Sequence, residues 1–281
     1  MLLVEADWLS SKYNGGDWKD SIIVVDGSWY LPNQKRDPLK EHMDCRVPKA
    51  RFFDIDSVCD PNSNLPHTIP DTNQFEKSMN KLGLKNTNHI VIYSKDGIGT
   101  SPRVWWLLKI FGHQKISILN GGFKAWKDIG GQSERGQYEN ITTNTYKANY
   151  NNNFFCNTEE VKVSMKNNNS QIVDARSQGR FKGIEPEPRK NLKAGHIPGS
   201  KNLPYQLFLN EKGFLLKADQ IKNVIAKADV DLNKSIISTC GSGVSACVLG
   251  LALELLGKNN WKIYDGSWTE WGGRRDTPIE T

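Results

Sequence analysis

Residues 236–257 read IISTCGSGVSACVLGLALELLG, a pattern of apolar, small and polar residues that is informative about the fold. A short apolar run ends at Cys240, and a turn of glycine and serine follows it. The next residues form an apolar segment that begins near Ser245 and closes at Gly257. A short apolar run bounded by turn residues is typical of a buried strand, and a glycine after the last periodic residue is typical of a helix end. The stretch predicts a strand, a tight turn and an amphipathic helix.

The same pattern occurs earlier in the chain, at residues 91–112, which read VIYSKDGIGTSPRVWWLLKIFG. In this register Asp96 lies opposite Cys240, and both segments are followed by a further strand and an aromatic turn. The two halves are offset by about 145–150 residues, which is the size of one domain. Alternating strands and helices predict an α/β fold in which each half is a mainly parallel sheet flanked by helices. We expect an N-terminal domain, a linker rich in Asn, Gly, Ser and Thr, and a C-terminal domain at residues 1–135, 136–155 and 156–281.

Composition excludes several classes of protein. The chain has 281 residues, a net charge of +6 and 37% hydrophobic residues. No apolar run reaches the roughly 20 residues of a membrane helix. Glu5 and Asp7 stand where a targeting peptide needs basic residues, which favours a cytoplasmic protein, with a mitochondrial one as the alternative. The net positive charge is modest and no nucleic-acid-binding motif accompanies it, so the sequence does not indicate a nucleic-acid-binding protein. Five cysteines without C-x-x-C spacing predict neither a disulfide framework nor a zinc site, and favour a single reactive thiol.

Cys240 is the candidate for that thiol. It stands at the carboxyl end of a predicted strand of an open parallel sheet, where ligands bind. Gly241 and Gly243 allow the following backbone to turn its N–H groups toward one point, and the helix that begins near Ser245 directs the positive end of its dipole there. A thiolate held in this way has a lowered pKa. The alternative is a structural cysteine buried before a tight turn; Asp96 at the matching position of the first half argues against it.

Two enzyme types use a cysteine in such a loop. A cysteine phosphatase needs an arginine six positions after the cysteine to bind a phosphate dianion, and that position here is Ala246. A persulfide needs only a cradle of amides, because its charge rests on the terminal sulfur. The residues expected to form this cradle are Gly241, Ser242, Gly243, Val244, Ser245 and Ala246.

Five motifs carry a resemblance to a known family. They are CGSGVSA at 240–246, GRFKGIEPEPR at 179–189, GHIPG at 195–199, RFFDID at 51–56 and YDGSWTEW at 264–271. With these motifs the sequence resembles the tandem rhodanese-domain sulfurtransferases, and among them the branch that uses 3-mercaptopyruvate. The resemblance covers nearly the whole chain. It implies two rhodanese-like domains, of which the second is catalytic and the first is not.

The resemblance also implies roles for residues outside the cysteine loop. Arg180 and Arg189 match the two arginines that bind the substrate carboxylate and carbonyl, a role that suits the planar guanidinium. Ser242, His67 and Asp56 match a serine–histidine–aspartate relay that moves protons. Relatives that prefer thiosulfate carry basic side chains after the cysteine, so a neutral loop implies a donor with one carboxylate.

Glu185 and Glu187 are expected to form weak charge pairs at the surface. Of the remaining histidines, His196 is expected to be structural, and His42 and His113 are expected at the surface.

The implied reaction passes the sulfur of 3-mercaptopyruvate through a Cys240 persulfide to an acceptor and releases pyruvate. Thioredoxin, a low-molecular-weight thiol or cyanide would be the acceptor, and no metal, organic cofactor, nucleic acid or membrane is implied. Three alternatives stay open. They are a thiosulfate sulfurtransferase, a persulfide carrier that serves tRNA thiolation or cofactor sulfuration, and a binding module without catalysis.

Overall fold

The computed structural model describes residues 1–16, 21–137, 141–167 and 169–281. These residues form two compact units. The first contains residues 1–61, 70–151 and 211–215, and the second contains residues 62–69, 152–210 and 216–281. Each unit therefore includes one short segment from the other half of the sequence. The domain limits expected at residues 135 and 156 stay a prediction.

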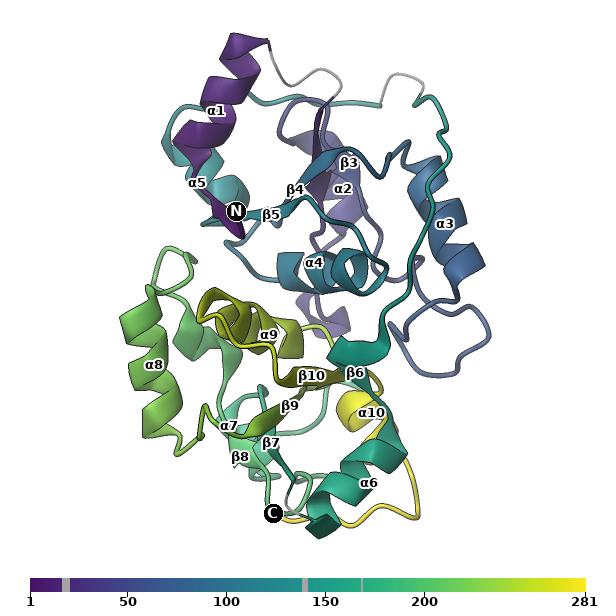
Figure 1. The fold of residues 1–281 in the computed structure, drawn as a ribbon, viewed down its shortest axis with the longest axis vertical. Coiled ribbons are helices and arrows are strands. Elements are labelled where there is room, and N and C mark those ends of the chain that lie inside the picture. The colour runs from purple at the N-terminus through teal and green to yellow at the C-terminus, as the bar shows by residue number, and fades with distance from the viewer. Residues whose placement is uncertain (17–20, 138–140, 168) are drawn as a thin grey trace. The chain divides into compact units, whose positions relative to one another are not determined.

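Each unit is built on a five-stranded parallel sheet (Figure 1). The first sheet has the order β1-β5-β4-β2-β3, with strands at Leu3–Val4 (β1), Ile22–Asp26 (β2), Arg51–Phe52 (β3), His89–Tyr93 (β4) and Ile116–Leu119 (β5). The second has the order β6-β10-β9-β7-β8, with strands at Phe155–Cys156 (β6), Ser170–Asp174 (β7), Lys201–Asn202 (β8), Ser235–Thr239 (β9) and Trp261–Tyr264 (β10). Numbered within its own half, the strand order is the same in both sheets, and the predicted parallel sheets are confirmed.

Helices follow the strands in both units. Those of the first unit are Ala6–Gly15 (α1), Pro32–Gln34 (η1), Pro38–Asp44 (α2), Thr72–Lys81 (α3), Ser101–Ile110 (α4) and Gly122–Asp128 (α5). Those of the second are Asn152–Phe154 (η2), Thr158–Asn167 (α6), Gln178–Phe181 (α7), Tyr205–Phe208 (η3), Ala218–Lys227 (α8), Ala246–Leu255 (α9) and Ser267–Trp271 (α10). The helix after the cysteine turn thus begins at Ala246, one residue beyond the expected Ser245.

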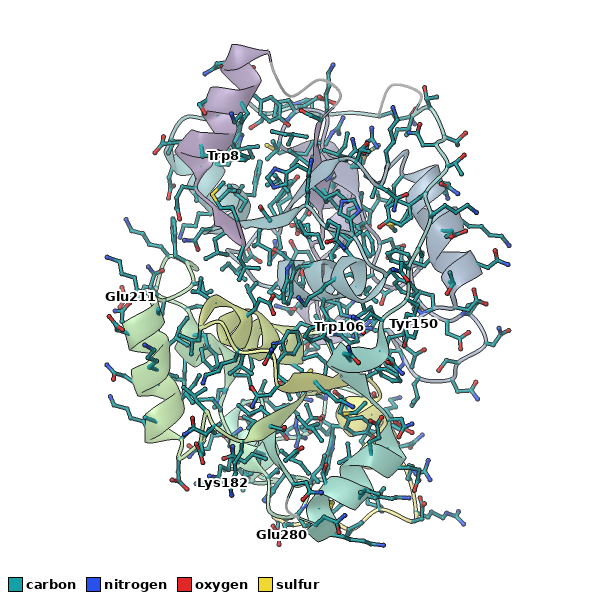
Figure 2. The ribbon with its side chains drawn as sticks, viewed as in Figure 1. Trp8, Trp106, Tyr150, Lys182, Glu211 and Glu280 are labelled. Atoms are coloured by element: carbon teal, nitrogen blue, oxygen red, sulfur yellow. The ribbon has the colours of Figure 1, made fainter. Side chains whose placement is uncertain are left out.

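The predicted amphipathic character of α4 and α9 is wrong. All residues of α9 from Ala246 to Leu253 are buried, and in α4 every residue except Lys109 is buried. Trp106 of α4, labelled in Figure 2, has no exposed surface. A helix that is apolar all round is a core helix, and a Cβ on Gly250 would lie 2.8 Å from the Trp261 ring, so α9 needs a glycine there. These buried helices fix the glycine-rich turns that precede them.

His42 and His113 lie in the core of the first unit, contrary to the expectation of surface positions. Nδ1 of His42 lies 2.7 Å from the carboxylate of Asp26, and both side chains are fully buried. His113 is 5% exposed; its ring nitrogens lie 3.0 Å from the Tyr146 hydroxyl and 3.0 Å from the Asn88 carbonyl oxygen. Buried polar groups are tolerated where hydrogen bonds replace water, and both rings meet that condition.

Candidate active site

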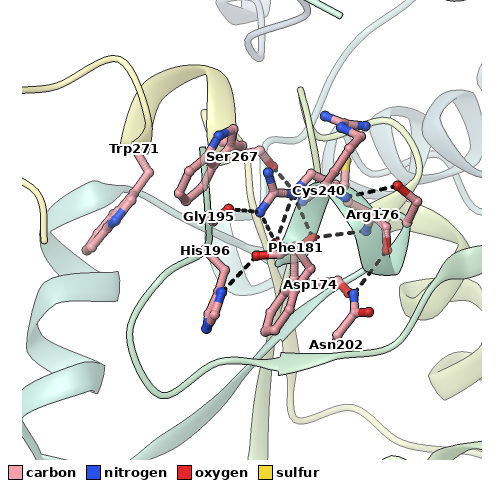
Figure 3. A network of polar contacts seen from close by, with 12 residues as sticks. Asp174, Arg176, Phe181, Gly195, His196, Asn202, Cys240, Ser267 and Trp271 are labelled. Carbon is pink, nitrogen blue, oxygen red and sulfur yellow. Dashed lines mark hydrogen bonds and ion pairs between the residues drawn. The ribbon is translucent and has the colours of Figure 1, made fainter. Parts of the chain in front are cut away.

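Cys240 directly follows β9, and its backbone is held by the turn after β10. Its N–H donates to Oγ of Ser267 at 3.2 Å, and its carbonyl accepts from the N–H of Trp268 at 3.0 Å. The carbonyl of Gly241 accepts from the N–H of Thr269 at 2.8 Å. Cys240 is 1% exposed, so the thiol lies in a sheltered place. Figure 3 shows Cys240 and Ser267 within one network of polar contacts.

The loop between Cys240 and α9 keeps backbone donors available. Within the described residues, five N–H groups of this loop donate to no oxygen or sulfur: those of Gly241, Ser242, Val244, Ser245 and Ala246. Gly243 has a φ of 74°, in the region that favours glycine, and so turns the chain between the strand and the helix. Donor groups at the N-terminus of a ten-residue helix stabilise a negative charge. The loop is chemically able to hold an anionic sulfur.

His67 reaches this loop from the segment 62–69. Its Nδ1 lies 3.0 Å from Oγ of Ser242, and the two residues are 2% and 4% exposed. His67 has a φ of 64°, an uncommon value for a residue with a side chain. Two positions along the chain, the N–H of Ile69 donates to Oδ2 of Asp265 at 2.7 Å. The histidine and the serine singled out from the sequence are therefore within hydrogen-bond distance.

Asp56 belongs to the first unit. Nε1 of Trp29 donates to both of its carboxylate oxygens at 3.0 Å, and the N–H of Asp56 donates to Asp54. The participation of Asp56 in a relay with His67 stays a prediction.

Arg180 lies beside the cysteine loop. A Cβ placed on Gly241 would be 3.0 Å from Nη2 of Arg180, so the absence of a side chain at 241 lets the guanidinium approach the backbone. The same Nη2 donates to Glu187 at 2.6 Å. Arg189 is half-buried further along this segment, and its role in substrate binding stays a prediction.

Glu187 connects Arg180 to a second, fully buried arginine. Arg176 donates to Glu187 at 2.8 Å and to both carboxylate oxygens of Asp174 (Figure 3). Burial works to lower the pKa of Arg176, yet the charges and hydrogen bonds of Asp174 and Glu187 raise it above its usual value. The guanidinium also lies over the ring of Trp268, 4.3 Å from its centroid. The expected weak surface pair at Glu187 is wrong, because only 4% of this side chain is exposed.

Sequence reasoning missed several contributors to the site. Three of them lie in the quoted motifs, but the spacing of the motifs does not reveal their partners. Glu187 binds Arg176 and Arg180, Asp265 binds the segment of His67, and Ser267 binds the backbone of Cys240. Tyr205 was missed entirely. Burial and, to a smaller extent, the electrostatic interaction with Cys240 raise the pKa of its phenol. The sequence feature that could have pointed to Tyr205 is the motif GHIPG, which ends six residues before it.

The corresponding loop of the first unit is occupied by other contacts. Asp96, at the position of Cys240, forms an ion pair with Arg36. The N–H of Ile98 donates to the carbonyl of Gly213 at 3.0 Å, and the N–H of Ser101 donates to Ile98. This loop therefore binds the segment 211–215, whereas the loop after Cys240 faces His67.

The described residues contain neither a metal-binding cluster nor a membrane-spanning helix. Across residues 1–16, 21–137, 141–167 and 169–281, no group of three or more His, Cys, Asp or Glu side chains could hold a metal ion. In the same part of the chain, every helix is too short or too polar to cross a membrane.

Comparison with known proteins gives consistent matches. The rhodanese-like domain family matches residues 5–129 and 157–274. Thiosulfate/3-mercaptopyruvate sulfurtransferase 1, mitochondrial, of Arabidopsis thaliana is 35% identical over 299 residues, which cover 99% of this chain and 78% of that protein. Thiosulfate sulfurtransferase of Rattus norvegicus is 38% identical over 284 residues, covering 99% and 94%. The crystal structure of SseA from Escherichia coli, described with the 3-mercaptopyruvate sulfotransferases, is similar with a TM-score of 0.86 and 34% identity, covering 95% of this chain and 99% of that one.

Proposed function

The chain belongs to the rhodanese family of sulfurtransferases, and from this premise we propose that it takes its sulfur from 3-mercaptopyruvate through a persulfide on Cys240. The observation that carries the proposal is the loop itself. Its unpaired N–H groups follow a sheltered cysteine directly, and the only residues that fill it are small and neutral. Peptide dipoles, and not cationic side chains within the loop, then stabilise the charged sulfur.

In the first half-reaction the Cys240 thiolate attacks the sulfur of 3-mercaptopyruvate. An S–S bond forms, the C–S bond breaks, and its electron pair becomes the enolate of pyruvate. Arg180, with Arg189, binds the carboxylate and the carbonyl oxygen, so that the enolate charge is stabilised as it develops. The proton of the substrate thiol passes by way of Ser242 and His67 to the enolate carbon, and Asp56 completes the relay. Pyruvate leaves, and the outer sulfur rests among the amides of residues 241–246.

In the second half-reaction an acceptor thiolate attacks the outer sulfur. The S–S bond to Cys240 breaks, the cysteine thiolate is regenerated, and the acceptor carries away the sulfur as its own persulfide. Thioredoxin and low-molecular-weight thiols are the acceptors we propose. We place the reaction in the cytoplasm, with the mitochondrion as the alternative, since the Arabidopsis relative carries that designation.

The mass of the intact protein after incubation with 3-mercaptopyruvate tests this function. Wild type should gain the mass of one sulfur atom, and Cys240→Ser should gain none. Cys247→Ser is the matched control, because Cys247 is also buried but lies inside α9, and it should behave as wild type. Turnover of 3-mercaptopyruvate by Cys240→Ser at the wild-type rate would exclude covalent catalysis at this residue.

Thiosulfate is the second candidate donor, favoured by the similarity to the rat thiosulfate sulfurtransferase. Replacement of Arg180 and Arg189 together should impair 3-mercaptopyruvate turnover far more than thiosulfate turnover, because a carboxylate and a carbonyl lose their partners. Equal losses with the two donors would argue against binding of the carboxylate and carbonyl by these arginines, and assays of the wild type with both donors side by side show which one it prefers. A persulfide carrier would show the same mass gain as the enzyme, but with slow release to small thiols.

A further inference from the structure

Residues 265–269, which form the turn after β10 and the start of α10, contact two parts of the site at once. Ser267, Trp268 and Thr269 bind the backbone of Cys240 and Gly241, as described above. Asp265, at the other end of the turn, accepts from the N–H of Ile69 at 2.7 Å and is 7% exposed. The two residues that this segment binds, Ile69 and Cys240, are 171 positions apart in the sequence.

The segment bound by Asp265 carries His67 in a strained conformation. A non-glycine residue with a φ of 64° persists only where its surroundings hold it. Hydrogen bonds to an ionised carboxylate are stronger than neutral ones, and the bond from Ile69 is short and sheltered. Since Ile69 lies two residues after His67, this bond fixes the end of the strained segment nearest the imidazole.

We propose that Asp265 is a positioning residue that holds His67 against Ser242, so that the turn 265–269 sets the distance between the proton-carrying pair and the nucleophile. The proposal rests on the sulfurtransferase mechanism given above and adds to it a residue that does not touch substrate. The turn is short and is hydrogen-bonded at both ends. Its bonds to Cys240 and Gly241 come from Ser267, Trp268 and Thr269, so loss of the Asp265 carboxylate leaves these bonds in place and removes the bond to the His67 segment, where Nδ1 lies 3.0 Å from Oγ of Ser242.

Steady-state kinetics with 3-mercaptopyruvate test the proposal. Asp265→Ala should lower kcat about tenfold to a hundredfold, because a hydrogen bond to a charged group is lost, and should leave KM within about twofold, because the arginines that bind substrate are untouched. Asp265→Asn should retain kcat within about threefold, since its amide oxygen accepts the same bond. Asp265→Glu keeps the charge but moves the carboxylate, and should lose about as much as the alanine variant.

A double-mutant cycle with His67→Ala shows whether Asp265 acts through the histidine. If it does, Asp265→Ala/His67→Ala should have a kcat within about twofold of His67→Ala alone. Multiplied losses, a fully active Asp265→Glu, or an Asp265→Asn as impaired as Asp265→Ala would each overturn the proposal. If the alanine variant fails to fold, the asparagine and glutamate variants decide the question by themselves.

Asp231→Ala is the matched control, because Asp231 also accepts a backbone N–H, that of Asn233, but is exposed and belongs to another loop. It should leave kcat and KM unchanged. Failure of the proposed function would appear as turnover of 3-mercaptopyruvate by Cys240→Ser at the wild-type rate. Failure of this inference alone would appear as an unimpaired Asp265→Ala in an enzyme that still depends on Cys240.

Discussion

Glu187 is the residue whose surroundings differ most from those its sequence suggests. It stands in a run of charged and proline residues, yet its carboxylate is shared by Arg176 and Arg180 with little contact to solvent. Together with Asp174 it balances the two guanidinium charges within one network. Removal of one partner from such a network leaves a buried charge without compensation, which costs far more than the loss of a surface pair.

Replacement of this carboxylate should therefore destabilise the second unit. Glu187→Gln is expected to lower its free energy of unfolding by about 3 kcal/mol, because Arg176 and Arg180 lose the charge between them. Urea denaturation measures this loss. KM for the sulfur donor should also rise, since Arg180 is no longer held beside Gly241.

Glu185→Gln serves as the control for Glu187→Gln. Glu185 lies two residues away, is exposed and accepts from the hydroxyl of Ser177 at 2.6 Å. It should change the free energy of unfolding by less than about 1 kcal/mol. Similar losses in the two variants would contradict a special role for the buried network.

The two strand–turn–helix elements show how one pattern serves two purposes. After β9 the N–H groups of Gly241, Ser242, Val244, Ser245 and Ala246 donate to no acceptor within the described residues, and a buried helix follows. After β4 the turn has glycines at the same positions. Here, however, Ile98 and Ser101 donate their N–H groups to carbonyl oxygens, and Asp96 forms an ion pair with Arg36. A Cβ on Gly97 would lie 2.6 Å from the carbonyl oxygen of Gly213, so this turn is filled by backbone. Within the described residues, the second element therefore has more N–H groups left for a ligand than the first.

A cysteine alone should therefore not restore chemistry to the first element. In the Cys240→Ser background, Asp96→Cys is expected to gain no sulfur from 3-mercaptopyruvate. Ile98 and Ser101 already donate their N–H groups to carbonyl oxygens, position 102 is a proline without an N–H, and the side chain at 96 is 64% exposed, so a thiolate there would be poorly stabilised. Intact mass spectrometry tests this, with the wild type treated in parallel. A gain of one sulfur would show that the remaining contacts of the turn do not prevent persulfide formation.

At the scale of the whole molecule, two histidines of the first unit, His89 and His113, link stability to pH. Burial lowers the pKa of His89, aided by nearby positive charges that include the N-terminal amine and Lys115. Burial likewise lowers the pKa of His113, although its hydrogen bond to the Asn88 carbonyl works in the opposite direction. In the unfolded chain both histidines titrate near the ordinary value of about 6.5. As the pH falls through this value the unfolded state binds more protons than the folded state, so stability is lost.

The first unit should accordingly lose stability between about pH 7.5 and about pH 5.5. His113→Gln removes one of the two titrations and keeps a side chain that can donate and accept hydrogen bonds. Urea midpoints measured across this range should fall less steeply for the variant than for wild type. Equal slopes would mean that His113 is not a source of the acid sensitivity.

Much of the fold and part of the site followed from the sequence by itself. The repeated pattern of apolar strand, glycine-rich turn and helix predicted two parallel sheets, because each crossover is encoded within a short stretch of chain. The position of Cys240 at a strand end predicted its loop, and the family motifs led to His67 and Ser242 as partners. The strand order was not predictable, since pairing joins segments that are distant along the chain.

The burial of individual residues, and the inclusion of two short segments in the unit formed by the other half of the sequence, became known from the folded chain alone. His42 and His113 have polar side chains, yet both are buried. His42 is accommodated by a contact with Asp26, and His113 by contacts with Tyr146 and Asn88. The segments 62–69 and 211–215 each join the unit formed by the other half, which no local pattern records. Ile69 and Asp265 meet across 196 residues. Strands, turns and helices follow from the local sequence because residues that are close along the chain determine them. Burial and the placement of side chains at the site depend on residues that are distant along the chain and meet only when it folds.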